Sequence, residues 1–234
     1  MKSKIILIFL ISSILFSQNI VVRDNNISSM IEQISSKNLE LYVKKLVEFK
    51  TRHTLSTRTK TNEGIGAACY WVMSKFDEFA KSSNGRLITK MDSFYVEPDG
   101  RRVIRKVLLT NPMAILKGTD KNDNRIFIVG AHIDSRAGEA NDSTSLAPGA
   151  NDDASGVAAV IELARIMSKY EFPSTIIFVA FSGEEQGLYG ATHLAKKAKD
   201  ENWNIIAMLN NDMIGNSYSN ETFLKDNMQV RVFS

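Results

Sequence analysis

The sequence contains a single cysteine, Cys69, so no disulfide bond can form within the chain. Cys69 lies in the apolar segment 67–73, which is typical of a buried helix face and predicts a small core residue rather than a reactive thiol. The sequence also lacks a basic block with interleaved aromatic residues, which makes nucleic acid a poor candidate partner. Its one basic cluster of note is expected to be a solvated strand edge: Arg101, Arg102, Arg105 and Lys106.

The N-terminal apolar run, Ile5 to Phe16, is too short to span a bilayer comfortably. Lys2 and Lys4 precede it and small polar residues follow it, which is the pattern of a secretory signal peptide. We therefore expect residues 1–17 to be a signal peptide, with an uncleaved membrane anchor or a buried N-terminal helix as alternatives. Its removal takes away two lysines and lowers the formal charge from +3 to +1. The protein is then expected to be secreted or periplasmic, with no stable membrane association.

Internal repeats and low-complexity linkers are absent from the sequence. Its 234 residues, of which 44% are hydrophobic and 24% charged, suffice for one domain with a substantial core, expected over residues 18–234. Apolar patterns predict helices over residues 38–50, 62–81, 153–170 and 188–199, and strands over residues 86–96, 102–117, 126–131, 175–181 and 205–209. This alternation predicts an α/β fold, a three-layer α/β/α sandwich with a mixed, largely parallel central sheet.

Polar side chains follow three of the expected buried strands. His132 and Asp134 come after the first of these strands, Glu184 and Glu185 after the second, and Asp212 after the third. In parallel α/β sheets, ligands bind at the carboxyl ends of the strands. We therefore expect these side chains to converge at one edge of the sheet.

Asp152 and Asp153 stand at the expected start of a helix, where free N–H groups favour carboxylates. One imidazole and several carboxylates form a ligand set suited to zinc, and without a cation so many acids would repel one another. Two neighbouring metal ions can activate a water molecule and polarise a carbonyl. Of the aspartate pair, Asp153 is expected to be a helix cap or to support a ligand from behind.

Four segments carry a specific resemblance. They are residues 130–135 (GAHIDS), 149–156 (GANDDASG), 182–190 (SGEEQGLYG) and 211–215 (NDMIG). In this order and at these spacings they resemble the bacterial leucyl-type aminopeptidases with co-catalytic zinc, over roughly residues 40–216. The superfamily of zinc exopeptidases to which those enzymes belong also includes glutaminyl cyclase and glutamate carboxypeptidase.

The resemblance implies a site for two zinc ions and a peptide substrate. His132 and Asp212 would bind one zinc, Glu185 would bind the other, and Asp152 would bridge the two. It also implies a cis peptide bond between Asp152 and Asp153.

Two further acids receive roles from the same resemblance. Asp134 would orient His132 and so determine the imidazole tautomer. Glu184 would be the general base, which takes a proton from the metal-bound water and passes it to the leaving amine. The implied activity is hydrolysis of the N-terminal peptide bond by a metallo-aminopeptidase.

One ligand of the family pattern has no counterpart. The family supplies a final histidine to the second zinc, downstream of the Asp212 segment. Of the three histidines in the chain, His53 is expected in a loop and His193 on a helix surface, so neither fits. The chain ends at Ser234, and we expect a C-terminally truncated, N-terminal part of the domain in which the second metal is weak or absent.

Other functions remain open from the sequence. Glutaminyl cyclases have a similar fold, but they have a single aspartate where this chain has Asp152 and Asp153. Carboxypeptidases of the superfamily share the metal site, and some relatives keep the fold as non-catalytic binding modules. The oligomeric state is not predicted.

Overall fold

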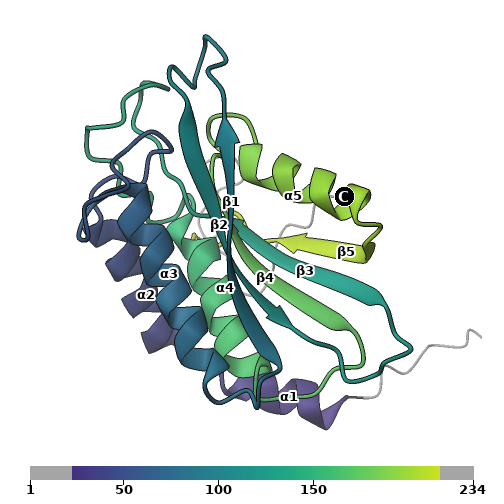
Figure 1. Ribbon diagram of the computed structural model, residues 1–234. Helices are drawn as coiled ribbons and strands as arrows, with labels where there is room; N and C mark the ends of the chain where they lie inside the picture. Colours follow the sequence, from purple (N-terminus) through teal and green to yellow (C-terminus); the bar gives the residue numbers. More distant parts are fainter. Residues whose placement is uncertain (1–22, 217–234) are drawn as a thin grey trace, which may run out of the picture.

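A computed structural model describes residues 23–216 of the chain, so the expected signal peptide and the last 18 residues lie outside the described range. The fold is built on a five-stranded sheet with the strand order β1-β2-β4-β3-β5 (Figure 1). The strands are β1 Leu87–Val96, β2 Val107–Leu116, β3 Arg125–His132, β4 Thr175–Phe181 and β5 Asn204–Asn210. The helices are α1 Asn25–Glu32, α2 Ser36–Glu48, α3 Gly64–Ala80, α4 Ala154–Met167 and α5 Tyr189–Asp200.

The sheet is mixed, as predicted. β3 pairs in parallel with β4 on one side and with β5 on the other. β2 pairs antiparallel with both β1 and β4, so β2 runs opposite to the other four strands. Because β3, β4 and β5 run in the same direction, the residues that follow their last positions meet at one edge of the sheet.

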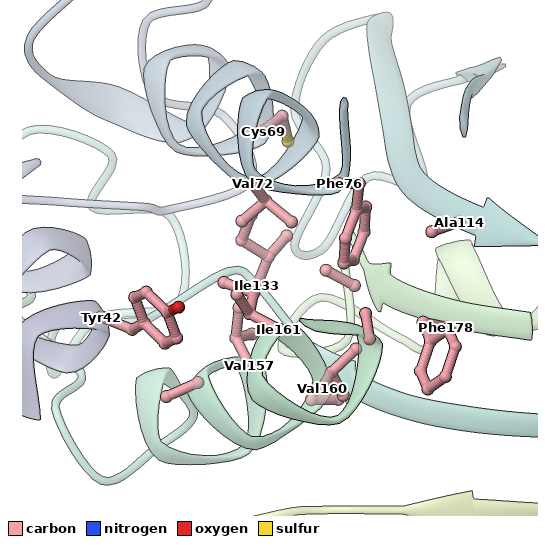
Figure 2. Packing of buried hydrophobic residues seen from close by; sticks show 14 of the residues in the cluster. Tyr42, Cys69, Val72, Phe76, Ala114, Ile133, Val157, Val160, Ile161 and Phe178 are labelled. Atoms are coloured by element: carbon pink, nitrogen blue, oxygen red, sulfur yellow. The ribbon is translucent and has the colours of Figure 1, made fainter. Parts of the chain in front are cut away.

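Helices α2, α3 and α4 cover one face of the sheet (Figure 1). Alternate β4 residues, Ile176, Phe178 and Ala180, point into the core that these helices close. Figure 2 shows this core, with Cys69 of α3 among its members. Cys69 is 1% exposed, and burial raises the pKa of its thiol to about 11, which confirms the prediction of an unreactive core residue.

Helix α5 covers the opposite face and completes the three layers. The other β4 residues, Ile177, Val179 and Phe181, pack on this side with Leu194 of α5. The edge strand β5 is much less covered, since Ile206 is 52% exposed and Leu209 is 64% exposed. Within residues 23–216, no helix has the length and apolar content that crossing a bilayer requires.

Two local differences from the sequence prediction have physical causes. β2 begins at Val107 instead of residue 102, because one carboxylate oxygen of Asp99 accepts the main-chain N–H groups of residues 101, 102 and 103 and folds that stretch into a wide turn. The expected basic strand edge is therefore an exposed loop. Helix α1 was not predicted; Asp24 caps it, and it buries no residue of its own.

Candidate metal centre

The carboxyl ends of the parallel strands bring three predicted residues together. His132 is the last residue of β3, Asp212 follows β5, and Asp152 precedes α4. The Nε2 atom of His132 lies 3.0 Å from Asp152 Oδ1 and 3.9 Å from Asp212 Oδ1. One donor atom from each residue fits within a 4.8 Å group, so the predicted convergence is confirmed for these three side chains.

This donor set fits a zinc ion. An imidazole nitrogen and two carboxylate oxygens are ordinary zinc ligands, and three protein ligands with an open fourth position are typical of catalytic zinc sites. The His132 side chain is only 4% exposed, whereas the side chains of Asp152 and Asp212 are 46% and 44% exposed. The centre therefore has a buried nitrogen on one side and solvent-accessible oxygens on the other.

Asp153 is buried at the junction of three elements. Its Oδ1 accepts the N–H of Gly156, 3.0 Å away, and caps α4. Its Oδ2 accepts the N–H of His132, 3.1 Å away, and its Oδ1 also accepts the N–H of Met213, 3.2 Å away. The capping role is confirmed, and the bond between Asp152 and Asp153 is cis, as the resemblance implied. Burial raises the pKa of Asp153 to about 7.

The first turn of α4 is shaped to receive the segment after β5. A Cβ atom on Gly156 would lie 2.1 Å from the carbonyl oxygen of Asn211 and 2.6 Å from Asp153 Oδ1. No larger residue could stand there without moving the main chain next to Asp212. Gly156 therefore helps to bring the third side chain to the centre.

Asp134 contacts the imidazole of His132 through its main chain. The Nδ1 atom of His132 lies 3.2 Å from the main-chain carbonyl oxygen of Asp134, whereas the carboxylate is 3.8 Å away. The carboxylate accepts the N–H groups of Gly183, Glu184 and Glu185, at 2.9 to 3.1 Å, and the hydroxyl of Thr54. The side chain of Asp134 therefore holds the loop after β4, and the carbonyl group contacts the imidazole.

Glu184 and Glu185 lie beside the three-residue cluster and are not members of it. Burial is the largest cause that raises the pKa of each glutamate; His132 opposes the shift at both, and Asp152 adds to it. The Glu185 carboxylate lies 3.7 Å from the Nε of Arg136. Glu184 and His132 border a cavity of about 250 Å³, whose other walls are mostly apolar, with Phe181 and Met208 among them.

The pKa of His132 is raised although its burial alone would lower it. The nearby carboxylates of Asp134, Asp153, Glu184 and Asp152 outweigh the burial because each favours the charged imidazolium. Without a metal ion, a proton would therefore offset part of the negative charge. A zinc ion can replace that proton and supply more charge.

The remaining histidines are held by other partners. His53 lies in a loop, as predicted, and is fully buried there. Its Nδ1 accepts the N–H of Leu55, and its Nε2 lies 2.9 Å from the carbonyl oxygen of Ala140 and 3.1 Å from the Gln186 amide. His193 stacks on Phe94 and lies 3.2 Å from Asp92, with 30% of its side chain exposed. Neither belongs to the cluster of His132, Asp152 and Asp212, so neither supplies the final histidine of the family pattern.

Sequence reasoning missed the structural role of residues 52–54. Arg52, His53 and Thr54 are all buried and all hydrogen-bonded to segments around the site. They stand in a stretch rich in Thr and Ser that was interpreted only as a loop. No periodic pattern marks such residues, because their partners are distant main-chain and side-chain groups.

A family model and several known proteins match the chain. The model of Peptidase family M28 matches residues 111–232, which include all six predicted site residues. A protein of Pyrenophora tritici-repentis, described as a probable zinc metalloprotease, is 45% identical over 211 residues, covering 90% of this chain and 48% of its own length. The chain thus spans about half the length of this curated relative. The relatives of this kind are fungal, so the bacterial leucyl-type subgroup is not established.

Solved structures share the fold. The Legionella pneumophila LapA aminopeptidase is 25% identical, with a TM-score of 0.58 over 80% of this chain and 45% of that chain. A glutaminyl cyclase of Fimbriiglobus ruber has a TM-score of 0.59 at 20% identity, over 76% of this chain and 61% of that chain. The α/β sandwich is therefore shared by proteins that catalyse different reactions. The residues of the site, and not the fold, determine which reaction is catalysed.

Proposed function

Because this chain belongs to peptidase family M28, we propose that it acts as a zinc-dependent aminopeptidase, which removes the N-terminal residue of a peptide. The observation that carries the proposal is the convergence of His132, Asp152 and Asp212 within 4.8 Å, with Glu184 on the wall of the adjoining cavity. Since the chain spans about half of its curated relatives, the proposal concerns the activity of the protein as a whole.

We assign His132 and Asp212 to one zinc ion and Glu185 to a second, with Asp152 between the two. Bound zinc would polarise the scissile carbonyl and acidify the attacking water. Glu185 lies outside the three-residue cluster and faces Arg136, so its side chain has to turn away from that arginine to reach a metal. Asp134 would hold both glutamates in place by accepting their main-chain N–H groups.

Glu184 is proposed as the general base. It is partly buried beside His132 and Asp152, and burial raises the pKa of its carboxyl group. A glutamate with a raised pKa is better suited to accept a proton from water near neutral pH and then to donate it to the leaving amine. The direction of the shift therefore supports Glu184 in this role.

The test is the substitution Glu184→Gln, with the exposed Glu171→Gln as a matched control. We expect Glu184→Gln to lower kcat for an aminoacyl p-nitroanilide by about 10²- to 10⁴-fold while leaving zinc content unchanged. The control should match the wild type in both measurements. Wild-type turnover by Glu184→Gln would eliminate Glu184 as the base.

Substrate choice separates the alternatives. An aminopeptidase should cleave the aminoacyl substrate and leave its N-acetylated form intact, since it requires a free amine. A carboxypeptidase should instead cleave an N-acetylated peptide that has a free C-terminal carboxylate. A glutaminyl cyclase should convert an N-terminal glutamine to pyroglutamate, which stays attached to the peptide. A non-catalytic binding module should bind zinc or a peptide and turn over none of them.

We also propose that the protein is exported, on the strength of the basic and apolar pattern of residues 1–17. Its substrates would then be peptides outside the cytoplasm. The N-terminal sequence of the mature protein tests this: a start near residue 18 supports export, and an intact Met1 opposes it.

A further inference from the structure

Arg52 is a buried cation beside the metal centre. Only 1% of the residue is exposed, and within residues 23–216 every hydrogen bond from its side chain ends on a main-chain carbonyl oxygen. Nε donates to Ile133 (2.8 Å), Nη1 donates to Pro148 (2.7 Å) and Leu46 (3.1 Å), and Nη2 donates to Gly149 (2.9 Å). The planar fork thus satisfies four carbonyls at once.

Three of these four carbonyls belong to the two segments that carry proposed ligands. Ile133 directly follows His132 at the end of β3. Residues 148–149 lead into Asp152, at the start of α4. The guanidinium group therefore joins the segment of the buried imidazole to the loop of the bridging carboxylate.

The contact at Gly149 is tight. A Cβ atom there would lie 2.9 Å from Arg52 Nη2 and 2.4 Å from the carbonyl oxygen of Asp152. The Gly149 carbonyl also accepts the N–H of Ala154, 3.0 Å away, in the first turn of α4. One oxygen atom is thus shared by Arg52 and the helix that follows Asp152.

The main chain of Arg52 is anchored to the same two segments. Its N–H donates to Ser135 Oγ at 3.1 Å, and Ser135 Oγ donates to the carbonyl of Ala147 at 2.7 Å. The N–H of Ala147 in turn donates to the carbonyl of Lys50 at 2.8 Å. Hydrogen bonds thus hold Arg52 both at its main chain and at its guanidinium group, so the residue has little freedom to move relative to residues 147–149.

A charge is expensive to bury, which makes a purely space-filling role a poor explanation. Burial lowers the pKa of Arg52 to about 10, so the side chain stays charged at neutral pH. The opposing influence comes from Asp134, Asp153 and Asp152, which are the acids of the site. The positive charge of Arg52 therefore offsets part of the negative charge of these three carboxylates.

We propose that Arg52 is a positioning residue of the metal centre, which holds the His132 segment and the Asp152 loop at the spacing that zinc requires. The inference rests on the proposed function, because it takes His132 and Asp152 as ligands. Groups that orient metal ligands from behind affect metal affinity by about 10- to 100-fold when they are removed.

The test measures zinc affinity of the full chain by competition with a chromophoric chelator, for Arg52→Met and Arg52→Lys. Arg52→Met removes both the fork and the charge, and we expect zinc affinity to fall by about 10- to 100-fold. Arg52→Lys keeps the charge but cannot bridge four carbonyls, so its affinity should lie between those of Arg52→Met and the wild type. Near-UV circular dichroism verifies that each variant is folded.

Arg86→Met is the matched control. Arg86 also donates to a main-chain carbonyl, that of Ser168 at 3.1 Å, but it precedes β1 at the opposite edge of the sheet. We expect this control to lower the melting temperature without changing zinc affinity. A merely structural Arg52 would behave in the same way.

Each outcome bears on the proposal. Folded Arg52→Met with wild-type zinc affinity would overturn it. If Arg52→Met does not fold, wild-type affinity in Arg52→Lys would overturn it equally, because the fork would then be dispensable. Failure of the wild-type chain to bind zinc would overturn the proposed function together with this inference, whereas unchanged variants beside a zinc-binding wild type would overturn the inference alone.

Discussion

His132 and Asp212 face the same proposed metal position from two very different regions of the molecule. His132 is 3% exposed and stands between the buried residues Ala131 and Ile133. Asp212 follows the edge strand β5, and the next two residues, Met213 and Ile214, are 53% and 48% exposed. Within residues 23–216, one side of the centre is thus part of the core, and the other is exposed.

The two regions also differ in how they are held. Around His132, the buried carboxylates of Asp134 and Asp153 accept hydrogen bonds from several segments. The Asp212 segment depends on a few contacts, including the N–H of Met213 to Asp153 and the N–H of Gly215 to the Asn151 side chain, at 3.2 and 3.0 Å. Substitutions in the His132 region should therefore affect folding and metal binding together, whereas those in the Asp212 region should affect metal binding alone.

The largest effect is expected for Asp134→Ala. This change leaves the N–H groups of residues 183, 184 and 185 without their acceptor in a buried place, which should cost about 3 kcal/mol or more of unfolding free energy. Urea denaturation measures it. The matched control is Asp99→Ala, because Asp99 also accepts three main-chain N–H groups but is exposed, so water can replace it. Equal losses for the two variants would contradict the contrast between buried and exposed acceptors.

Asp212→Ala should separate metal binding from folding. Because Asp212 is exposed and proposed as a ligand, zinc affinity should fall by about 100-fold or more, while the metal-free protein loses about 0.5 kcal/mol or less of unfolding free energy. Chelator competition and urea denaturation measure the two quantities. A large stability loss in the metal-free variant would show that the Asp212 segment is as much a part of the core as the His132 segment.

The pH dependence of the metal-free protein should have one sign above about pH 6, because carboxyl groups with a lowered pKa, such as Asp142, are by then ionised in both the folded and the unfolded state. The pKa values of Asp153, Glu184 and Glu185 are raised, so the folded state binds more protons than the unfolded state above the ordinary carboxyl pKa of about 4. His132, whose pKa is also raised, contributes stability below its ordinary value of about 6.5, and that contribution is lost as pH rises through the higher folded value. The metal-free protein should therefore become less stable as the pH rises from about pH 6 to pH 8.

Bound zinc should reverse this loss of stability with rising pH, since the metal ion replaces the protons that the site loses. Melting temperatures measured with and without zinc between pH 6 and pH 8 should diverge as pH rises. Parallel curves would mean that the metal does not bind at His132 and Glu185, the proposed ligands whose pKa values are raised.

The smallest effect is expected for Arg136→Ala. The partly exposed pair of Arg136 and Glu185 is worth about 1 kcal/mol at most, so its loss should strengthen zinc binding through Glu185 by about fivefold or less. Isothermal titration of the second zinc equivalent measures the change. Weaker binding in the variant would mean that Arg136 supports the site and does not compete for Glu185.

The same contrast explains what the sequence could predict. β3 and β4 are short continuous apolar runs, and β5 is recognisable by its apolar centre, so their ends and the residues after them were found from local patterns. Because β3 pairs with β5 in parallel, His132 and Asp212 lie at the same end of neighbouring strands. The convergence of the site residues thus follows from strands that run in the same direction, and local sequence patterns reveal where those strands end.

The interactions that hold the site depend on distant parts of the chain. The Asp134 carboxylate binds a loop 49 to 51 residues away, and three of the four carbonyls that Arg52 binds are 81 to 97 residues away. Neither produces a periodic pattern, because a buried polar residue is identified by its partners and not by its neighbours in sequence. The burial of His53 within its loop was missed for the same reason.

The most direct test of this account is the zinc position in crystals of the wild-type chain, located by anomalous diffraction at the zinc absorption edge. The account predicts an anomalous peak bonded to His132 Nε2, an Asp152 oxygen and an Asp212 oxygen. A peak bonded to other residues, or zinc-loaded crystals with no peak between these three side chains, would contradict it.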